Sequence, residues 1–481
     1  MVFSSITFLL YFLPIVILMN FALGFSRRLQ NIWLLIASLF FYAWGEPIYV
    51  LVMIGSIICN WVLGLLVGSF DEKKAVKKLF LIIGCVLNLG NLVLFKYTGF
   101  LVETLNIVIG EEIFTDPQIR LPIGISFYTF QAMSYVIDVY QKKAKVQKNV
   151  LNLGLYIAFF PQLVAGPIVR YTTVEKQIMN RKVNWDMFCA GICRFAEGLI
   201  KKILLANNLA IVADNIFGLT VYGATDVPVP MMLAWVGAIA YTLQLYYDFG
   251  SYSDMAIGLG MIFGFTFPEN FRYPFISKSI KEFMARWHIS LSAWFTQYVY
   301  KPLGGARDEN QDKMIRNIFI VWLLTGIWHG ANWTFIWWGL YFFLFIVVEN
   351  LIQIEQIEGH DVLRRIYTLF AVIIAMVIFR CEDISQLTVF MSDMFMISGN
   401  GFWSDTAIML LKEYGLVFVM AIICALPMRN YIEAWIGYSP KQNAIKAIYR
   451  GGYILGMIAL YILCIAVLAK GGYNPFIYFN F

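Results

Sequence analysis

Apolar runs of membrane-spanning length recur from one end of the sequence to the other, and they limit the possible folds more than any other feature. A helix that crosses the hydrocarbon core of a bilayer needs about 20 predominantly apolar residues. Backbone polar groups cannot reach water inside lipid, so such runs must form helices that satisfy their own hydrogen bonds. The composition agrees, because 60% of the 481 residues are hydrophobic and only 14% are charged. The sequence predicts an all-α polytopic membrane protein with about eleven transmembrane helices.

Basic residues gather in short loops between the apolar runs. Lysine and arginine in such loops stay on the cytoplasmic side of a membrane, so their positions indicate how each helix is oriented. The basic clusters are Arg27 and Arg28; Lys73, Lys74, Lys77 and Lys78; Lys142, Lys143, Lys145 and Lys148; and Arg429, Lys441, Lys446 and Arg450. The alternation of these clusters with uncharged or acidic loops predicts that the N-terminus and the C-terminus both lie outside the cytoplasm.

The chain has no clear linker between modules. Apolar runs continue without a soluble appendage, so residues 1–481 are expected to form a single integral membrane domain. The first apolar segment has no basic leader, which favours a retained helix over a signal peptide. A net charge of +6 is modest and does not indicate nucleic-acid binding. Membrane lipids are the expected surroundings.

One apolar segment differs from the others because both of its flanks are basic. Residues 151–170 read LNLGLYIAFFPQLVAGPIVR, with Lys148 before the segment and Arg170 at its end. Pro161, Gly166 and Pro167 interrupt any helix there. Irregular backbone at membrane depth is tolerated only where protein or a water-filled cavity covers it. The segment therefore predicts a re-entrant hairpin beside an internal cavity.

His329 lies inside a long apolar run, where an ionisable side chain is costly and is by default a candidate functional residue. Gly326 and Gly330 flank it, and small residues let a ligand or a backbone come close. A neutral imidazole can accept the proton of a hydroxyl that attacks an acyl donor, so His329 is the candidate general base. The alternative is a structural histidine that only satisfies a hydrogen bond.

His288 is the second candidate, in an amphipathic stretch with several cations nearby. Those cations can act as anchors at the membrane interface. They can also line the mouth of a funnel that receives an anionic, phosphate-rich donor such as a coenzyme A thioester. The candidate donor-binding residues are Arg286, Lys301, Arg307 and Asn332.

Other catalytic motifs are missing from the sequence. It contains no GxxxxGK[ST], GxGxxG, HExxH or GxSxG motif, and its seven cysteines show no metal-ligand spacing. Neither a metal site nor a bound cofactor is therefore expected. Four carboxylates in or near apolar runs are open to several roles, as histidine partners, ion pairs or part of a transport path: Asp138, Glu197, Asp248 and Asp254.

The two histidine segments resemble the membrane-bound O-acyltransferase family. The resemblance rests on two stretches, RWHISLSAWFTQYVYKPLGG and, about forty residues later, TGIWHGANWTFIWWGLYFF. The N-terminal MVFSSITFLLYFLP, the PQLVAGPIVR stretch and the terminal PFIYFNF are similar to the bacterial alginate O-acetyltransferase subgroup. The resemblance thus extends along the chain and is densest between residues 271 and 343.

This resemblance implies a ring of helices around a central tunnel in the bacterial cytoplasmic membrane. His329 would be the principal catalytic histidine and His288 the second one. Acetyl-CoA would enter from the cytoplasm as a donor substrate, and the acetyl group would leave for an extracellular polysaccharide or cell-wall polymer. A partner acyltransferase of the SGNH type outside the cytoplasm is also implied.

The C-terminal segment PFIYFNF contains Tyr478, and related acyl-export systems carry an aromatic C-terminal motif with a tyrosine. Tyr478 could accept the acetyl group covalently, or it could be a simple interface anchor. Three other functions stay open. They are transfer of D-alanine or another acyl group to teichoic acid, transport of a lipid-linked sugar without chemistry, and a purely structural role in an export complex.

Overall fold

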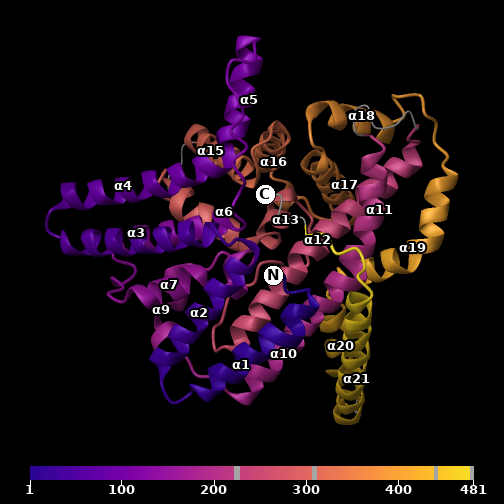
Figure 1. The fold of residues 1–481 in the computed structure, drawn as a ribbon. Coiled ribbons are helices and arrows are strands. Elements are labelled where there is room, and N and C mark those ends of the chain that lie inside the picture. The colour runs from indigo at the N-terminus through magenta and orange to yellow at the C-terminus, as the bar shows by residue number, and fades with distance from the viewer. Residues whose placement is uncertain (221–227, 306–310, 438–441, 477–481) are drawn as a thin grey trace.

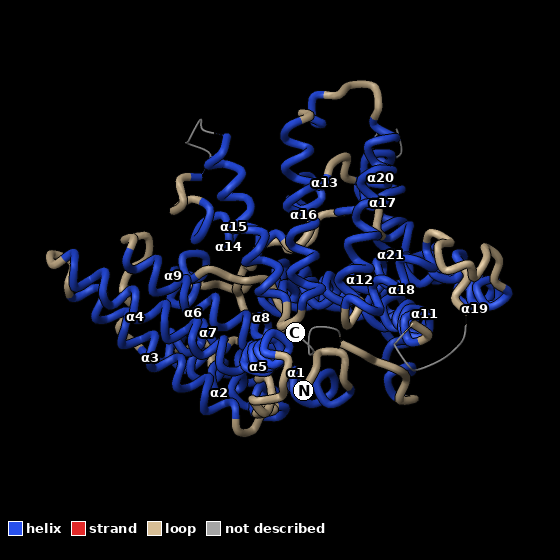
Figure 2. The backbone as a smooth tube through the Cα atoms, turned by 90° about the horizontal axis from the view of Figure 1, so that it is seen from above, coloured by secondary structure: helices blue, strands red, loops and turns tan. Residues whose placement is uncertain are grey.

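The computed structural model describes residues 1–220, 228–305, 311–437 and 442–476, and within them the chain is helical with no strand (Figures 1 and 2). The α-helices are α1 (Leu13–Ala22), α2 (Arg27–Gly45), α3 (Tyr49–Ser69), α4 (Lys74–Leu92), α5 (Thr98–Ile109), α6 (Ile125–Tyr140), α7 (Val150–Ala158), α8 (Phe160–Leu163), α9 (Tyr171–Asn180), α10 (Trp185–Ile200), α11 (Asn207–Gly218), α12 (Met231–Ile262), α13 (Ile280–Arg286), α14 (Ile289–Phe295), α15 (Gln311–His329), α16 (Trp333–Leu351), α17 (Asp361–Arg380), α18 (Ile384–Met394), α19 (Asp405–Cys424), α20 (Met428–Gly437) and α21 (Gln442–Ala469). The all-α prediction is confirmed.

Six helices in the described residues are long and apolar enough to cross a membrane. They are Tyr49–Ser69, Lys74–Ile109, Trp333–Leu351, Asp361–Arg380, Asp405–Cys424 and Asn443–Ala469. The prediction of about eleven spans also counted apolar runs that this fold divides into shorter or more polar helices. For example, α6 has only 16 residues, and α12 carries Asp248 and Asp254 among its apolar residues. The chain is a multi-pass membrane protein, and the larger count stays a prediction.

Helix α12 is the central element, and α10 and α11 pack against it. Glycines allow α10 to come close: a Cβ atom on Gly191 would lie 2.7 Å from the Gly258 carbonyl oxygen, and one on Gly258 would lie 2.6 Å from that of Gly191. Small residues at such crossings are typical of helix packing in membranes. The close approach fixes α12, which carries residues of the candidate site, against the body of the protein.

The N-terminal part forms a group of helices in which α3 and α4 lie side by side and both pack on α6 (Figure 1). Asp71, in the loop between α3 and α4, bridges two of the basic clusters. Its carboxylate oxygens lie 2.5 Å from Lys77 Nζ and 2.7 Å from Lys142 Nζ. The clusters at residues 73–78 and 142–148 therefore lie on the same side of the protein, as the positive-inside pattern requires.

The segment at residues 151–170 is interrupted where its prolines predict an interruption. Helix α7 ends at Ala158, the short helix α8 covers Phe160–Leu163, and the following residues are irregular. Residues 152–169 are buried throughout, so protein covers the irregular backbone. The backbone N–H of Ile168 donates to Ser290 Oγ at 2.9 Å, which attaches this segment to the start of α14, directly after His288.

Candidate active site

His329 is the last residue of α15, and a buried lysine holds the end of that helix. Lys96, from the π-helix η2 (Val93–Tyr97), donates through Nζ to the carbonyl oxygens of Trp328 at 2.7 Å and His329 at 3.1 Å. The hydroxyl of the next residue, Tyr97, donates to the Ile327 carbonyl at 2.5 Å. The last carbonyls of a helix have no intrahelical partner and favour a nearby cation. Lys96 and Tyr97 therefore fix the backbone that presents His329.

Small residues set the turn after His329. A Cβ atom on Gly330 would meet the Phe335 ring at 2.1 Å, and one on Gly326 would meet the Phe335 carbonyl oxygen at 2.5 Å. On α16, a Cβ atom on Gly339 would lie 2.5 Å from the Trp322 carbonyl oxygen. The α15–α16 hairpin can close this tightly only because glycine occupies these positions.

Aromatic rings surround both histidines. The His329 ring lies edge-on to Trp328, Trp338 and Phe379, with centroid distances of 5.1, 4.8 and 5.2 Å. The His288 ring lies 4.7 Å from that of Phe249 on α12 and 5.9 Å from that of Trp328. Both histidines are almost fully buried. Apolar walls of this kind exclude water and strengthen any electrostatic interaction inside.

The two histidines, 41 positions apart in the sequence, come together in space. Their ring centroids are 6.5 Å apart. His288 Nε2 and His329 Nδ1 are both buried with no hydrogen-bond partner in the described part of the chain. Buried polar atoms in native proteins nearly always find a partner in the protein or in ordered water, so these two nitrogens are open to a water molecule or to a group from outside the protein. Two imidazole nitrogens without a described partner thus belong to rings that lie near each other between aromatic side chains, which makes both candidates for contact with reacting groups.

His288 itself has an unusual backbone. Its φ of 47° and ψ of 50° place it in the left-handed region, which costs energy for a residue with a side chain. The surrounding contacts hold this conformation, because Ile289 N–H donates to the Asn270 carbonyl at 2.9 Å and His288 Nδ1 lies 3.1 Å from Asn270 Oδ1. Backbone strain that is supported in this way is common at functional sites.

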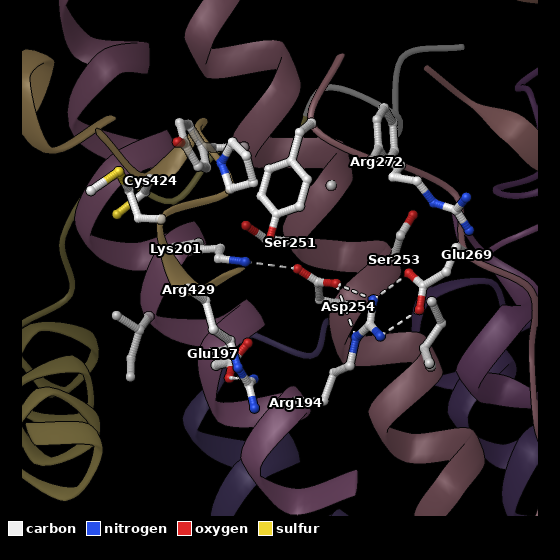
Figure 3. Close-up of a pocket in the computed structure, with 18 of the residues that line it drawn as sticks. Arg194, Glu197, Lys201, Ser251, Ser253, Asp254, Glu269, Arg272, Cys424 and Arg429 are labelled. Carbon is white, nitrogen blue, oxygen red and sulfur yellow. Dashed lines mark hydrogen bonds and ion pairs between the residues drawn. The ribbon is translucent and has the colours of Figure 1, made fainter. Parts of the chain in front are cut away.

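A pocket of about 1140 Å³ lies on the other side of Asn270. Residues of α10, α12 and α21 line it, together with the segment 269–276 and the residues from the end of α19 to the start of α20, and Figure 3 shows many of these side chains. Arg194 lies between two carboxylates there, with contacts of 2.8 Å to Asp254 and 2.5 Å to Glu269. Asn270 contributes to the wall of the pocket, and its side chain also contacts the His288 ring. The pocket and the His288 imidazole therefore share Asn270 as a neighbour.

The pocket lining carries more positive than negative side chains. Its cations are Arg194, Lys201, Arg272, Arg286 and Arg429, and its carboxylates are Glu197, Asp254 and Glu269. Asp254 pairs with both Arg194 and Lys201, at 2.8 and 3.1 Å. Of the other arginines, Arg286 contacts Glu282 at 2.9 Å and Arg429 contacts Glu433 at 3.0 Å, so the pocket offers an anionic ligand a cationic wall whose charge is partly compensated.

The other residues singled out by the sequence lie in different places. Arg286 lines the pocket, and its Nη2 contacts Glu282 at 2.9 Å. Lys301 is exposed, donates to Gln297 Oε1 at 3.1 Å and is not among the described lining residues. Asn332 caps α16 by accepting from Thr334 N–H and donates to the Glu382 carbonyl. Arg307 and Tyr478 lie outside the described residues, and all these roles stay predictions.

The four carboxylates left open by the sequence have cationic or phenolic partners. Tyr298 donates to Asp138 at 2.9 Å, and Glu197 accepts from the Tyr453 hydroxyl. Asp248 and Lys202 form a buried ion pair, and Asp254 contacts two cations of the pocket. These contacts favour the interpretation as ion pairs and hydrogen-bonded groups.

Sequence reasoning missed Lys96 and Asn270. Lys96 lies inside the apolar run of residues 79–97, so the signal that marked His329 could also have marked this lysine, because an ionisable group in lipid needs a partner. Asn270 had no such signal, since a lone asparagine in a polar loop is common. Its role depends on a fold that joins it to residues 253, 288 and 290.

Comparisons with known proteins give the family. The model of the membrane-bound O-acyltransferase family matches residues 147–382. A probable alginate O-acetylase, AlgI, of Pseudomonas putida is 36% identical over 503 residues, which cover 100% of both chains. A peptidoglycan O-acetyltransferase of Helicobacter pylori is 35% identical over 71% of this chain and 68% of its own. A teichoic acid D-alanyltransferase of Bacillus subtilis is 29% identical over 48% of this chain and 59% of its own. The match at full length confirms the predicted resemblance, and the chain belongs to the membrane-bound O-acyltransferase family as a multi-pass membrane acyltransferase.

Proposed function

We propose that this protein transfers acetyl groups from cytoplasmic acetyl-CoA, through the space between His288 and His329, toward an extracytoplasmic polysaccharide or cell-wall polymer. One observation carries the proposal. Two buried imidazoles with unpartnered nitrogens lie 6.5 Å apart, and a cation-rich pocket reaches one of them through Asn270. The two relatives with the higher identities are named as O-acetylating proteins, which favours acetyl over D-alanyl as the transferred group.

In this proposal His329 acts as the general base. It takes the proton of an attacking hydroxyl while the hydroxyl oxygen bonds to the carbonyl carbon of the thioester. The carbon–sulfur bond then breaks, and the leaving thiolate takes the proton from the His329 imidazolium. His288 assists from the opposite side of the site. The aromatic walls keep water from competing with the acceptor hydroxyl.

The pocket of about 1140 Å³ is the proposed donor site. Its volume exceeds that of a typical small-molecule pocket, which is about 300–1000 Å³, and so suits a long ligand such as a coenzyme A thioester. Arg286, Arg272 and Arg429 on its wall would hold the phosphates, and the acyl end would point to Asn270 and His288. Lys301, Arg307 and Asn332 keep their place as further candidates for donor binding.

Replacing Arg286 by alanine should weaken acetyl-CoA binding by about 10- to 100-fold, because one charge-assisted contact to phosphate contributes about 1.5–3 kcal/mol. The measurement is equilibrium binding of labelled acetyl-CoA to the purified protein. Lys281→Ala is the matched control, since Lys281 lies on the same helix but pairs with Glu355 and does not line this pocket. Equal binding by the wild type and Arg286→Ala would refute this placement of the donor.

The acceptor side is proposed to lie outside the cytoplasm, with both chain termini, in the bacterial cytoplasmic membrane. Asn474 Nδ2 donates to the Ser4 carbonyl at 3.0 Å, so the described ends of the chain lie next to each other. That contact supports a topology in which both termini share one side. An SGNH-type acyltransferase on that side is the proposed partner that delivers the acetyl group to the polymer.

Tyr478 is the proposed intermediate acceptor. The tail before it is anchored near the site, because the Phe476 ring lies 4.9 Å from that of Tyr252 on α12. Tyr252 is one helical turn from Phe249, whose ring contacts His288. The described tail therefore ends on the same helix, α12, that carries the Phe249 ring beside His288.

A Tyr478→Phe variant should abolish polymer acetylation in cells if this hydroxyl carries the acetyl group, because phenylalanine has no nucleophilic oxygen. Acetate released from isolated polymer by mild base is the measurement. Tyr473→Phe is the matched control, since Tyr473 lies in the same tail and its hydroxyl contacts Asp214 at 2.8 Å. Full acetylation by Tyr478→Phe would exclude the shuttle while leaving direct transfer or transfer through the partner open.

A further inference from the structure

The side chain of Asn270 joins three groups that the fold brings together. Its Oδ1 atom lies 3.2 Å from the backbone nitrogen of Ser290, 2.8 Å from Ser290 Oγ and 3.1 Å from His288 Nδ1. Its Nδ2 atom donates to Ser253 Oγ on α12 at 3.0 Å. Asn270 and Ser290 are both buried, so this network is shielded from water.

The Ser290 backbone decides which end of the Asn270 amide faces His288. A backbone N–H can only donate, so the amide atom that faces it must be the oxygen. His288 Nδ1 approaches the same oxygen, and a carbonyl oxygen can only accept. The Nδ1 atom must therefore carry a hydrogen. In the neutral imidazole the lone pair is then on Nε2, the buried nitrogen that has no partner in the described residues.

We infer that Asn270 is a positioning residue that fixes His288 in the tautomer protonated at Nδ1, so that Nε2 acts only as a hydrogen-bond acceptor in the active site. This inference rests on the proposed function for its catalytic meaning but not for its test. The two histidines are thus held in different ways. Lys96 fixes the backbone at His329, whereas Asn270 fixes the ring of His288.

The tautomer limits what His288 can do in acyl transfer. As a neutral imidazole with a bare Nε2 it cannot donate a hydrogen bond to the oxyanion that forms at the thioester carbon. It can only accept a hydrogen bond, and the donor must be a group other than the attacking hydroxyl, whose single proton goes to His329. The oxyanion at the thioester carbon must therefore be stabilised by a donor other than the neutral His288.

The chain contains only three histidines, which allows a direct test by nitrogen-15 NMR of the protein in lipid bilayers. Protonated and bare ring nitrogens have well separated chemical shifts, and carbon correlations show which nitrogen is which. The sample is full-length protein with ¹⁵N,¹³C-histidine and the substitutions His329→Gln and His360→Gln, so that only His288 contributes. We expect a signal from a protonated Nδ1 and a bare Nε2 at neutral pH.

Two variants of Asn270 distinguish a role in fixing the His288 tautomer from a role in packing alone. Asn270→Asp keeps an oxygen acceptor at Nδ1, so the Nδ1 proton should remain. Asn270→Ala removes the acceptor, so signal intensity should move to the tautomer protonated at Nε2. If the alanine variant does not fold, the wild-type background and the aspartate variant still decide the question. Three results would overturn the inference. Two concern the sample with native Asn270: an Nδ1 without a proton, or protons on both ring nitrogens. The third is an unchanged tautomer in a folded Asn270→Ala protein.

Turnover gives a second readout once acetyl transfer has been measured. Asn270→Ala should lower kcat by about 10- to 100-fold, while acetyl-CoA binding to the protein changes by less than about threefold. Failure of acetyl transfer in the wild type would refute the proposed function, whereas the NMR result would still stand. The two failures are therefore distinguishable.

Discussion

A His329→Ala variant is expected to lose polymer acetylation by about 10²- to 10⁴-fold, the range that a positioned general base contributes. The reason is geometric. His329 is held at the end of α15 by Lys96, and its Nδ1 is buried and unpartnered in the described part of the chain, 6.5 Å between ring centroids from His288. Ester-linked acetate on the isolated polymer, measured in cells that lack the native protein and express the variant, checks the expectation.

His360→Ala is the control for that experiment, since His360 is exposed and its Nδ1 contacts only the Glu358 carbonyl among the described residues. It should support wild-type acetylation. A His329→Ala protein that reaches the membrane at normal levels and still supports full acetylation would favour transport of a lipid-linked sugar or a structural role. In the structural case His288→Ala would also leave acetylation unchanged.

Lys202→Met is expected to destabilise the protein by about 3–5 kcal/mol, because it removes the cation of a buried ion pair while the Asp248 carboxylate stays buried. Lys202 and Asp248 pair between the π-helix η3 (Lys201–Ala206) and α12, and both side chains are almost fully buried. Lys202 also donates to the Pro475 carbonyl of the tail. The measurement is the thermal unfolding midpoint of the detergent-purified protein together with its level in membranes.

The adjacent lysine supplies the matched control. Lys201→Met also removes an ion pair, but the Lys201 side chain is one-third exposed and Asp254 keeps its contact with Arg194. Partly exposed pairs of this kind contribute about 0.2–1 kcal/mol. The double variant Lys202→Met/Asp248→Leu should recover most of the lost stability, because it removes both buried charges. A Lys202→Met protein as stable as Lys201→Met would contradict the account of the buried pair.

Much of the architecture follows from the sequence. Apolar runs predict helices, and the basic clusters at residues 73–78 and 142–148 do share one side, joined through Asp71. The interruption of residues 151–170 also follows from the sequence, because Pro161, Gly166 and Pro167 disfavour one continuous helix there. His288 and His329 can be selected as candidate functional residues from the sequence, because ionisable groups are rare in such an apolar chain.

What the sequence does not contain is the set of contacts between distant segments. Lys96 lies more than 230 positions before Trp328, and Asn270 acts through Ser253 and Ser290, so neither role has a local pattern. Lys301 is close to His288 along the chain, yet it is exposed beside Gln297. Proximity in sequence therefore led to Arg286, which lines the pocket, but was a poor guide to the other side chains of the proposed donor site.

The most direct test of the central claim is acetyl transfer by purified protein in sealed proteoliposomes, with labelled acetyl-CoA on the side of the basic clusters. We expect release of coenzyme A and appearance of labelled ester on protein or acceptor. Both products should be lost with His329→Ala and retained with His360→Ala. Thioester turnover at the wild-type rate in the His329→Ala protein would contradict the account.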